Sequence, residues 1–565
     1  MCIRDSHYSD PIAMLDLEPV IADLRLKIED PDYIRRLARE LLLDNAHRVT
    51  LVMSPDPELS SRRTAREKAR LAEIKSGMEA SQRQAVVTLA KDLAARQQQV
   101  DDADILPKVG LEDVPASLPD LDFRTIKNEQ LTITTYTQGT NGLVYQQAIA
   151  PLPPLTGQQL QVMPLYSSML TELGLGRHDY REVQNRQSAY VGAINAFNEM
   201  RGAVDDEQQV SGYFVLSSKA LARNAEQQAQ LIHDTLHQAR FDEDERIRDL
   251  VSQQRARREQ SITGNGHGLA MAAACSGMSP LAQLNHRLSG MAGIRELRQL
   301  DERLRDAGNL RSFASGLQEL HTLIAAAPLQ LLAISDEHSI EAVADLLHRI
   351  WSTGGRSGQS ETFTPTPLRE QRREMWLTNT QVNFCARAYP TVPVDHPDAA
   401  ALTVLGGFMR NGHLHRTIRE QGGAYGGGAS QDSSVAAFRF YSYRDPRLAE
   451  TLEDFDQAVD WMLREKHDYA ALEEAILGVI GSLDRPGSPA GEAKHHFHNR
   501  LFGRTHDQRE QFRQRILDVT LDDLGRVTET YLRPETASTA VITSSSQLEA
   551  TAPLRETLSM TVEEL

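Results

Sequence analysis

One order of secondary structure occurs twice along this chain of 565 residues. Each copy is predicted to contain a β-strand, a proline-punctuated turn, a helix and a second strand, in that order. These elements fall at 143–149, 151–154, 160–173 and 212–217 in the first copy, and at 381–389, 390–397, 398–410 and 437–443 in the second. A repeat of so long a period indicates duplicated domains rather than a solenoid. The predicted fold class is therefore α+β, built from two repeated units.

Individual residues match between the copies as well. Tyr190 aligns with Tyr425, and in the same register Gln184 stands where Arg419 stands. Only the second copy therefore carries an arginine and a tyrosine at these two positions.

A glycine-rich stretch lies between this arginine and this tyrosine. Leu414 and Ile418 are four residues apart, so they fall on one face of a helix that leads into the stretch. Gly422 and Gly423 are predicted to end the helix, because glycine tolerates the positive φ of a helix stop. An alternative interpretation is that residues 422–428 form a flexible linker.

Arg419 and Tyr425 lie on either side of this turn. A chain that folds back across the turn can direct a guanidinium and a phenol at one point. Both groups donate hydrogen bonds at neutral pH, which suits a carbonyl oxygen that gains negative charge. The stretch is therefore the main candidate for a functional site.

Several further elements are predicted from periodicity and turn residues. They are helical sequence at 16–44, a strand at 47–53, a long helical hairpin at 60–100, a β-hairpin of 131–136 and 143–149 around a turn at 138–142, strands at 329–335 and 538–543, and a linker at 353–366. The segment 47–53 and the helices before it are too small to bury a core, so they resemble the tail of a domain that begins before this chain.

Charge and composition narrow the classes of function. The net charge is −17, from 61 basic and 78 acidic residues, which argues against nucleic acid as a partner. No run of 18 or more apolar residues occurs, so no membrane span is predicted. The cysteines, Cys2, Cys275 and Cys385, form no C-x-x-C pair and are compatible with a reducing compartment. A soluble, cytoplasmic location is favoured.

Other short motifs are weaker candidates for metal or phosphate sites. His233 and His237 have the i, i+4 spacing that can hold zinc, but surface histidines on an amphipathic helix explain them as well. The histidine-dense segment 495–498 resembles a polar junction of loop and helix. The glycines of 264–268 indicate a turn, since the lysine and serine or threonine of a phosphate loop are missing.

The motif around the glycines closely resembles the C-terminal half of the pitrilysin/insulinase zinc metallopeptidases, in particular the presequence-protease branch. The resemblance covers nearly the whole chain from about residue 8. The segments that carry it are Leu414-His415-Arg416-Thr417-Ile418-Arg419-Glu420-Gln421-Gly422-Gly423-Ala424-Tyr425-Gly426-Gly427, Val382-Asn383-Phe384, Tyr389-Pro390-Thr391-Val392-Pro393, His396-Pro397-Asp398-Ala399-Ala400 and Tyr441-Ser442-Tyr443-Arg444-Asp445-Pro446-Arg447.

The resemblance implies an arrangement of α/β sandwich units that close around a peptide-sized chamber. The implied domains are the tail of a second unit at 7–57, a joining helical hairpin at 58–120, a degenerate third unit at 121–356 and a fourth unit at 365–548. The implied activity is that of a metalloendopeptidase that degrades unstructured peptides.

Site residues carry over from the family by position. Arg419 and Tyr425 are expected to reach the substrate and act in catalysis, and Asn383, Gly422, Gly423 and Gly426 are expected to bind substrate. The strand at 381–389 or its partner offers an edge for pairing with an extended peptide.

The zinc motif of the family, H-x-x-E-H, is missing from this chain. The closest string, at 334–338, has isoleucine where the first histidine is required, so no metal ligand is assigned. We expect zinc to be bound by an N-terminal half that is missing here and that is supplied in the same chain or as a separate partner. This chain alone is expected to be inactive. The alternative is a zinc-free homologue that serves as a binding or scaffold subunit.

Overall fold

A computed structural model of the chain describes residues 10, 16–54, 56, 58–97, 105, 107–127, 131–351, 363–549 and 551–565. Its contacts divide the chain into two compact units, Met1–Pro107 and Lys108–Leu565. The linker predicted at 353–366 lies mostly outside the described residues.

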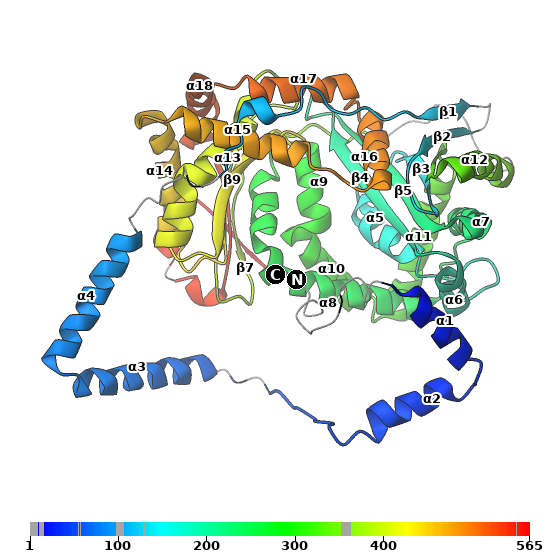
Figure 1. The fold of residues 1–565 in the computed structure, drawn as a ribbon, viewed down its shortest axis with the longest axis horizontal. Helices are drawn as coiled ribbons and strands as arrows, with labels where there is room; N and C mark the ends of the chain where they lie inside the picture. Colours follow the sequence, from blue (N-terminus) through cyan, green and yellow to red (C-terminus); the bar gives the residue numbers. More distant parts are fainter. Residues whose placement is uncertain are drawn as a thin grey trace. The chain divides into compact units, whose positions relative to one another are not determined.

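The described secondary structure of the first unit is helical. Its elements are α1 (Glu18–Lys27), α2 (Tyr33–Ala38), a π-helical turn (Arg39–Leu43), α3 (Leu59–Gly77) and α4 (Ala80–Gln97) (Figure 1). Helices α3 and α4 occupy the segment where two long helices are predicted. The predicted strand at 47–53 was wrong, because all of these residues are described and none belongs to a strand. Four apolar side chains of this segment are 80–86% exposed: Val49, Leu51, Val52 and Met53. A strand here would lack a neighbouring strand to hydrogen-bond with its backbone groups.

The second unit contains two six-stranded sheets, with strand orders β1-β2-β6-β3-β5-β4 and β12-β7-β11-β8-β10-β9 (Figure 1). The strands of the first sheet are β1 (Arg124–Lys127), β2 (Thr132–Thr137), β3 (Leu143–Pro151), β4 (Ala193–Gly202), β5 (Val210–Leu221) and β6 (Gln330–Ser335). Those of the second sheet are β7 (Arg373–Leu377), β8 (Phe384–Pro390), β9 (Gly426–Asp432), β10 (Ala437–Tyr443), β11 (Ser538–Thr543) and β12 (Thr561–Glu564).

The two sheets confirm the predicted duplication. Without the first strand of each order, the two sheets have the same sequence of pairing directions. The pairs β2–β6 and β7–β11 are parallel, and the remaining pairs are antiparallel. The outermost strands differ in origin. β1 precedes its sheet in the chain and is antiparallel to β2, whereas β12 follows its sheet and is parallel to β7.

The helices of the second unit surround these sheets (Figure 1). In the first copy they are α5 (Gly157–Leu170), α6 (Tyr180–Tyr190), α7 (Ala225–His237), α8 (Asp244–Cys275), α9 (Pro280–Ser289), α10 (Met291–Arg303), α11 (Ala307–Ala325) and α12 (Glu337–Trp351). In the second copy they are α13 (Ala399–Met409), a π-helix (Arg410–Gln421), α14 (Ala449–Arg464), α15 (Tyr469–Leu483), α16 (Pro489–Leu501), α17 (His506–Leu517), α18 (Leu521–Tyr531) and α19 (Ala552–Leu558).

The β-hairpin predicted around residues 138–142 was wrong, because β6 lies between β2 and β3. The turn geometry itself is present, with Asn141 and Gly142 at φ values of 54° and 76°. Asp336, which directly follows β6, accepts hydrogen bonds from the backbone N–H groups of Thr140 (2.8 Å) and Gly142 (2.6 Å). A distant segment therefore completes the turn, which local sequence cannot indicate.

Each copy contributes a helix that packs on the sheet of the other copy. Helix α8 of the first copy packs on the second sheet, where Ile262 and Leu269 share a core with Phe384 and Ile542. Helix α16 of the second copy packs on the first sheet, where Phe497 joins a core with Tyr136, Ile149, Val215, Leu332 and Ile334. Strand β8 is therefore covered on both faces. Its successive side chains point alternately towards α8 and towards the core beneath α13, because side chains alternate along a strand.

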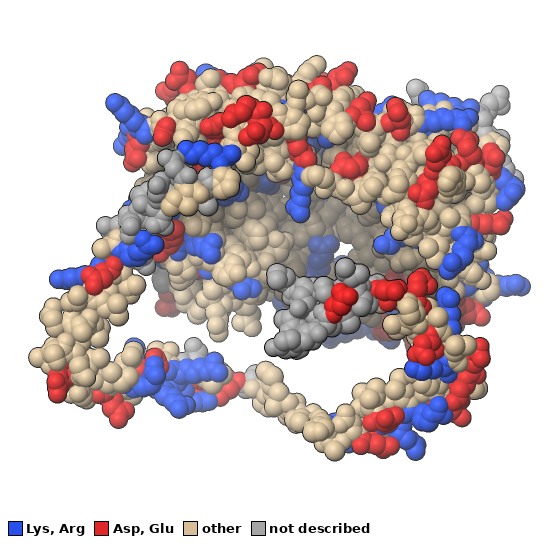
Figure 2. All heavy atoms as spheres, viewed as in Figure 1, with Lys and Arg blue, Asp and Glu red and all other residues tan. Residues whose placement is uncertain are grey.

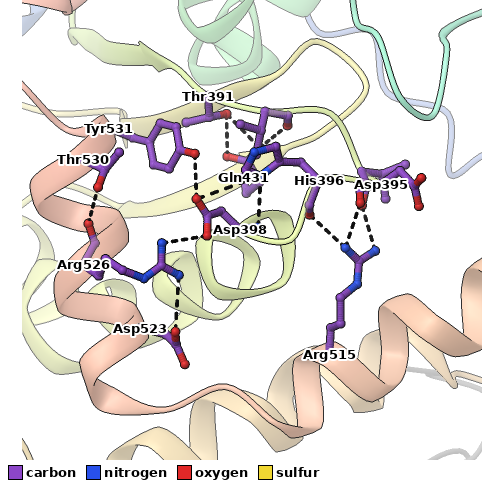
Figure 3. Close-up of polar contacts among 12 residues, drawn as sticks. Thr391, Asp395, His396, Asp398, Gln431, Arg515, Asp523, Arg526, Thr530 and Tyr531 are labelled. Atoms are coloured by element: carbon purple, nitrogen blue, oxygen red, sulfur yellow. Dashed lines mark hydrogen bonds and ion pairs between the residues drawn. The ribbon is translucent and has the colours of Figure 1, made fainter.

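Helices α17 and α18 fix the turn that precedes α13 (Figure 3). Arg515 donates to the backbone carbonyls of Asp395 and His396, each at 2.9 Å. The Asp398 carboxylate receives the Tyr531 hydroxyl at 2.7 Å and pairs with Arg526 at 2.8 Å. These contacts anchor the start of α13, whose far end leads into the glycine stretch.

Basic and acidic side chains alternate over the face drawn in Figure 2 and do not gather into one basic patch there. Among the described residues, no helix is both long and apolar enough to cross a membrane.

Candidate functional site

The helix predicted to lead into the glycines is a π-helix that continues α13 without a break. Leu414 and Ile418 are both fully buried, which confirms that they lie on one face. The N–H of Gly422 donates to the carbonyl of Thr417 at 2.9 Å, an i to i−5 bond that widens the last turn. Such widened turns are frequent at functional sites.

Gly422 and Gly423 end this helix for two different reasons. Gly423 has a φ of 79°, which a residue with a side chain rarely adopts. Gly422 is buried, and a Cβ atom there would lie 1.9 Å from Nη2 of Arg447. The same guanidinium nitrogen pairs with Asp454 at 2.7 Å and donates to the Thr417 carbonyl at 3.3 Å. The first glycine therefore makes room for an arginine that braces the helix end.

Tyr425 follows the turn and is held by its backbone and by a contact of its ring. Its N–H donates to the carbonyl of Tyr443 at 3.0 Å, and the two rings meet edge to face at 5.5 Å. The Tyr425 side chain is nevertheless 67% exposed, and within the described part of the chain its hydroxyl has no recorded hydrogen bond. The phenol is thus positioned by the protein and presented to solvent.

Helix α8 of the other copy supports this tyrosine indirectly. The His267 ring meets the Tyr443 ring edge to face at 4.8 Å, on the strand next to Tyr425. Burial lowers the pKa of His267. The turn predicted at 264–268 was wrong, because these residues lie inside α8, with a local break at Asn265 (φ −131°). Gly266 is required there, since a Cβ would come within 2.5 Å of the Phe384 ring.

Arg419 lies in the last turn of the π-helix and is exposed. Its Nη1 is 3.4 Å from Nε2 of His415, whose other ring nitrogen is 3.4 Å from the Glu420 carboxylate. Between these two described residues, Arg419 and Tyr425, no hydrogen bond is recorded. The turn therefore presents both donors on the surface without joining them to each other.

Gly426, Gly427 and Gly428 form the start of strand β9, which pairs with β10. The linker alternative was therefore wrong, because these residues belong to a sheet. A Cβ on Gly427 would lie 2.7 Å from Cγ2 of Ile418, so this glycine lets the strand approach the helix. A Cβ on Gly426 would meet nothing within 4 Å.

Asn383 was expected to bind substrate, but the structure places it inside the protein. It is 7% exposed, its Nδ2 donates to the Arg447 carbonyl at 3.1 Å, and its Oδ1 accepts from the Thr543 hydroxyl at 2.7 Å. Its backbone N–H and carbonyl both bond to Asp445. Asn383 therefore holds the loop that carries Arg447, and both polar ends of its side chain are bonded inside the protein.

Asp445 organises this loop, although no sequence pattern assigned it a role of its own. It is fully buried and receives the Thr451 hydroxyl at 2.7 Å and the Arg447 N–H at 2.9 Å. Burial raises the pKa of its carboxyl group. An aspartate followed by proline, just after the predicted strand 437–443, was the available signal.

The alignment of Tyr190 with Tyr425 was wrong by two residues. Tyr190 is the last residue of α6, whereas Tyr425 lies beyond its helix. Gly192 occupies the equivalent place, because its N–H donates to Lys219 at 2.8 Å just as that of Tyr425 donates to Tyr443. The first copy therefore carries a glycine at the tyrosine position.

Edge pairing of a peptide with residues 381–389 is also corrected. Strand β8 lies between β11 and β10, so neither it nor a direct partner has a free edge. The free edge near Tyr425 belongs to β9, the outermost strand of this sheet.

The histidine motifs do not assemble a metal centre. The rings of His233 and His237 lie 4.6 Å apart and pack on Trp351. Residues 495–498 are in α16 rather than at a loop junction, and His498 bonds to Glu199 (2.6 Å) and Gln147 (2.8 Å) of the first sheet. Within the described ranges, no cluster of three or more histidine, cysteine, aspartate or glutamate side chains could hold a metal ion.

Comparisons with known proteins match most of the chain. A family model for the region associated with peptidase family M16, subfamily C, matches residues 53–300, and the model described as "PreP C-terminal domain" matches residues 373–543. The mitochondrial presequence protease of Xenopus laevis is 27% identical over 557 residues, which cover 93% of this chain and 54% of that protein. That of Yarrowia lipolytica is 28% identical over 531 residues, which cover 93% and 52%. The chain thus spans about half the length of these relatives.

Solved structures share the fold at low sequence identity. A conserved protein from Enterococcus faecalis has a TM-score of 0.57 at 14% identity, covering 75% of this chain and 99% of that one. A peptidase M16 inactive domain from Pseudomonas fluorescens has a TM-score of 0.54 at 15% identity, covering 75% and 98%. These structures show the fold alone. The two family models at residues 53–300 and 373–543, together with the curated relatives, assign the chain to the pitrilysin/insulinase (M16) peptidase family, in its presequence-protease branch.

Proposed function

We propose that this chain is the substrate-binding half of a metalloendopeptidase that degrades unstructured peptides. The observation that carries the proposal is the presentation of Tyr425, which is fixed through its backbone and ring but leaves its hydroxyl exposed. A hydroxyl that is rigidly placed and unpaired can donate to a carbonyl oxygen without first giving up another partner.

Arg419 supplies a second donor on the other side of the glycine turn. Its guanidinium is exposed, and among the described residues its one recorded side-chain contact is the long one to His415. The remaining N–H groups are free to hold a backbone carbonyl of a peptide, which serves positioning. In this proposal Tyr425 stabilises the oxygen that gains charge and Arg419 orients the chain that carries it.

The free edge of β9 supports an extended substrate. Among the described strands, β9 pairs with β10 on one side alone, so alternate backbone N–H and C=O groups of residues 426–432 point away from the sheet. An unstructured peptide can add to such an edge as a further strand. Gly426 leaves open space beside Tyr425, so the peptide can approach closely.

The residues described in this chain do not fit a zinc site, because they offer no set of three suitable ligands. A metal would therefore be held by residues of the family's zinc-binding half. We expect that zinc titrated into this chain alone gives no tight one-to-one binding. Isothermal titration calorimetry and the zinc content after dialysis measure this. Stoichiometric uptake would show that the metal is not held by the other half alone, which contradicts the proposal.

Peptide binding tests the role of Arg419 in this chain by itself. Replacing Arg419 by methionine is expected to weaken the binding of an unstructured peptide about 10- to 100-fold, the typical effect of losing a hydrogen bond to a charged group. Fluorescence anisotropy with a labelled peptide of about twenty residues gives the Kd; that length is chosen so that the peptide spans the edge strand.

Arg416→Met is the matched control, since Arg416 is exposed on the same π-helix. It removes the same charge and is expected to leave the Kd within a few-fold. Equal affinities of the Arg419→Met and Arg416→Met variants would exclude a specific contact and favour the alternative of a scaffold subunit.

A further inference from the structure

A cavity of about 140 Å³ lies among helices α5, α8, α9, α10 and α11 of the first copy, away from the glycine turn. Its apolar wall includes Val162, Leu165, Ile294, Leu297 and Phe313. An apolar cavity of about 150 Å³ in another protein stays free of water and accepts benzene. The space here is partly open, and its volume is the right size for one benzene-sized group.

Arginines line the same cavity. Arg258 from α8, Arg287 from α9 and Arg303 from α10 contribute to the wall, with Glu296 as the acidic residue among its lining. Within the described residues, no ion pair is recorded for any of these three arginines. The lining therefore carries an excess of positive charge beside an apolar space.

Of the three arginines, Arg258 most strongly indicates an anion site, because it is half-buried. Its recorded hydrogen bond is a long one, from Nη1 to the Ser289 carbonyl at 3.3 Å. Burial lowers the pKa of its guanidinium. A cation that has lost water without gaining a counter-ion costs free energy, and a carboxylate that binds there regains it through charge-assisted hydrogen bonds.

A second hollow of about 650 Å³ adjoins the cavity and shares Val162, Leu300, Arg303 and Phe313 with it. A group that is larger than the cavity can extend along these shared residues into the hollow. The cavity is thus open to the end of a longer molecule as well as to a small one.

We propose that this cavity binds a carboxylate that bears a benzene-sized apolar group, with the apolar group against Leu165, Ile294 and Leu297 and the carboxylate at Arg258. Such a ligand is either a free aryl-alkanoic acid or the C-terminal phenylalanine of a peptide. The inference does not depend on the role proposed for Tyr425 and Arg419.

Calorimetric titration of the full chain with 4-phenylbutyrate tests the proposal, with 4-phenylbutanol as the probe that has the same apolar group and no charge. We expect one saturable site for the acid and binding of the alcohol that is at least tenfold weaker. Equal affinities for acid and alcohol, or no saturable binding of the acid, would overturn the proposal.

Two variants locate the site. Arg258→Met is expected to weaken 4-phenylbutyrate at least tenfold, whereas Arg257→Met, its exposed neighbour on α8 outside the lining, is expected to change the affinity less than twofold. Ser168→Leu narrows the cavity from α5 and is expected to abolish binding without removing a charge. Melting temperatures confirm that each variant is folded, and unchanged affinity in folded Arg258→Met and Ser168→Leu proteins would place the ligand elsewhere.

A short peptide that ends in phenylalanine, compared with its C-terminal amide, distinguishes the two sources of ligand. Tighter binding of the peptide acid than of 4-phenylbutyrate identifies a peptide end, and binding of 4-phenylbutyrate alone identifies a free acid. Equal binding of peptide acid and amide would contradict recognition of a carboxylate.

Discussion

Replacing Tyr425 by phenylalanine is expected to lower kcat about 10²–10³-fold, in a preparation that supplies the family's zinc-binding half, while KM changes little. The hydroxyl is the sole group removed. Because it has no recorded partner among the described residues, its loss leaves no buried group unpaired. The ring contact with Tyr443 and the backbone bond remain, so the melting temperature is expected to stay the same.

Initial rates with an internally quenched peptide measure this effect. Tyr190→Phe is the matched control, since Tyr190 is also an exposed tyrosine and lies at the end of α6 in the other copy. A loss in KM alone would assign Tyr425 to ground-state binding. An unchanged kcat and KM would remove Tyr425 from the proposed site altogether.

Replacing Gly422 by alanine is expected to destabilise the second unit by about 2–4 kcal/mol, more than any other single methyl group added in the glycine stretch. The new Cβ would stand 1.9 Å from Nη2 of Arg447 and 2.6 Å from the Ile418 carbonyl. The guanidinium must then leave Asp454, a buried residue whose carboxylate would lose its recorded ion pair.

Gly426→Ala is the control for this change, because its Cβ would meet nothing within 4 Å and its φ is not positive. We expect an effect of less than about 1 kcal/mol there. The urea midpoint of each variant gives the comparison. Similar midpoints for the two alanine variants would show that Arg447 moves aside without cost.

The regular parts of the second copy were predictable from local pattern. Strands β10 and β11 occupy the predicted residues 437–443 and 538–543, because their aromatic and β-branched residues favour strands and their apolar side chains alternate between two covered faces. Leu414 and Ile418 were placed correctly because helical spacing determines a shared face.

The elements that frame the candidate site were missed where distant contacts override local preference. Three glycines disfavour a strand, yet β9 forms because β10 lies ready to pair with it. Glycines also disfavour a helix interior, yet helix resumes directly after the kink at Asn265, where Gly266 fits against Phe384. The structural role of Asn383 depends on Arg447 and Thr543, which lie far along the sequence.

The exchange of α8 and α16 between the two copies bears on how this duplication can change over generations. The first copy has a glycine where Tyr425 stands in the second, so it has no equivalent donor. Its own helix nevertheless covers Phe384 in the second sheet, while Phe497 of the second copy covers the first. A copy without the donor still packs its helix on the sheet of the other copy. Deletion of either copy, in contrast, would expose an apolar sheet face of the other to water. The first copy can therefore vary at the position of the donor while its helix α8 stays necessary to bury the second sheet.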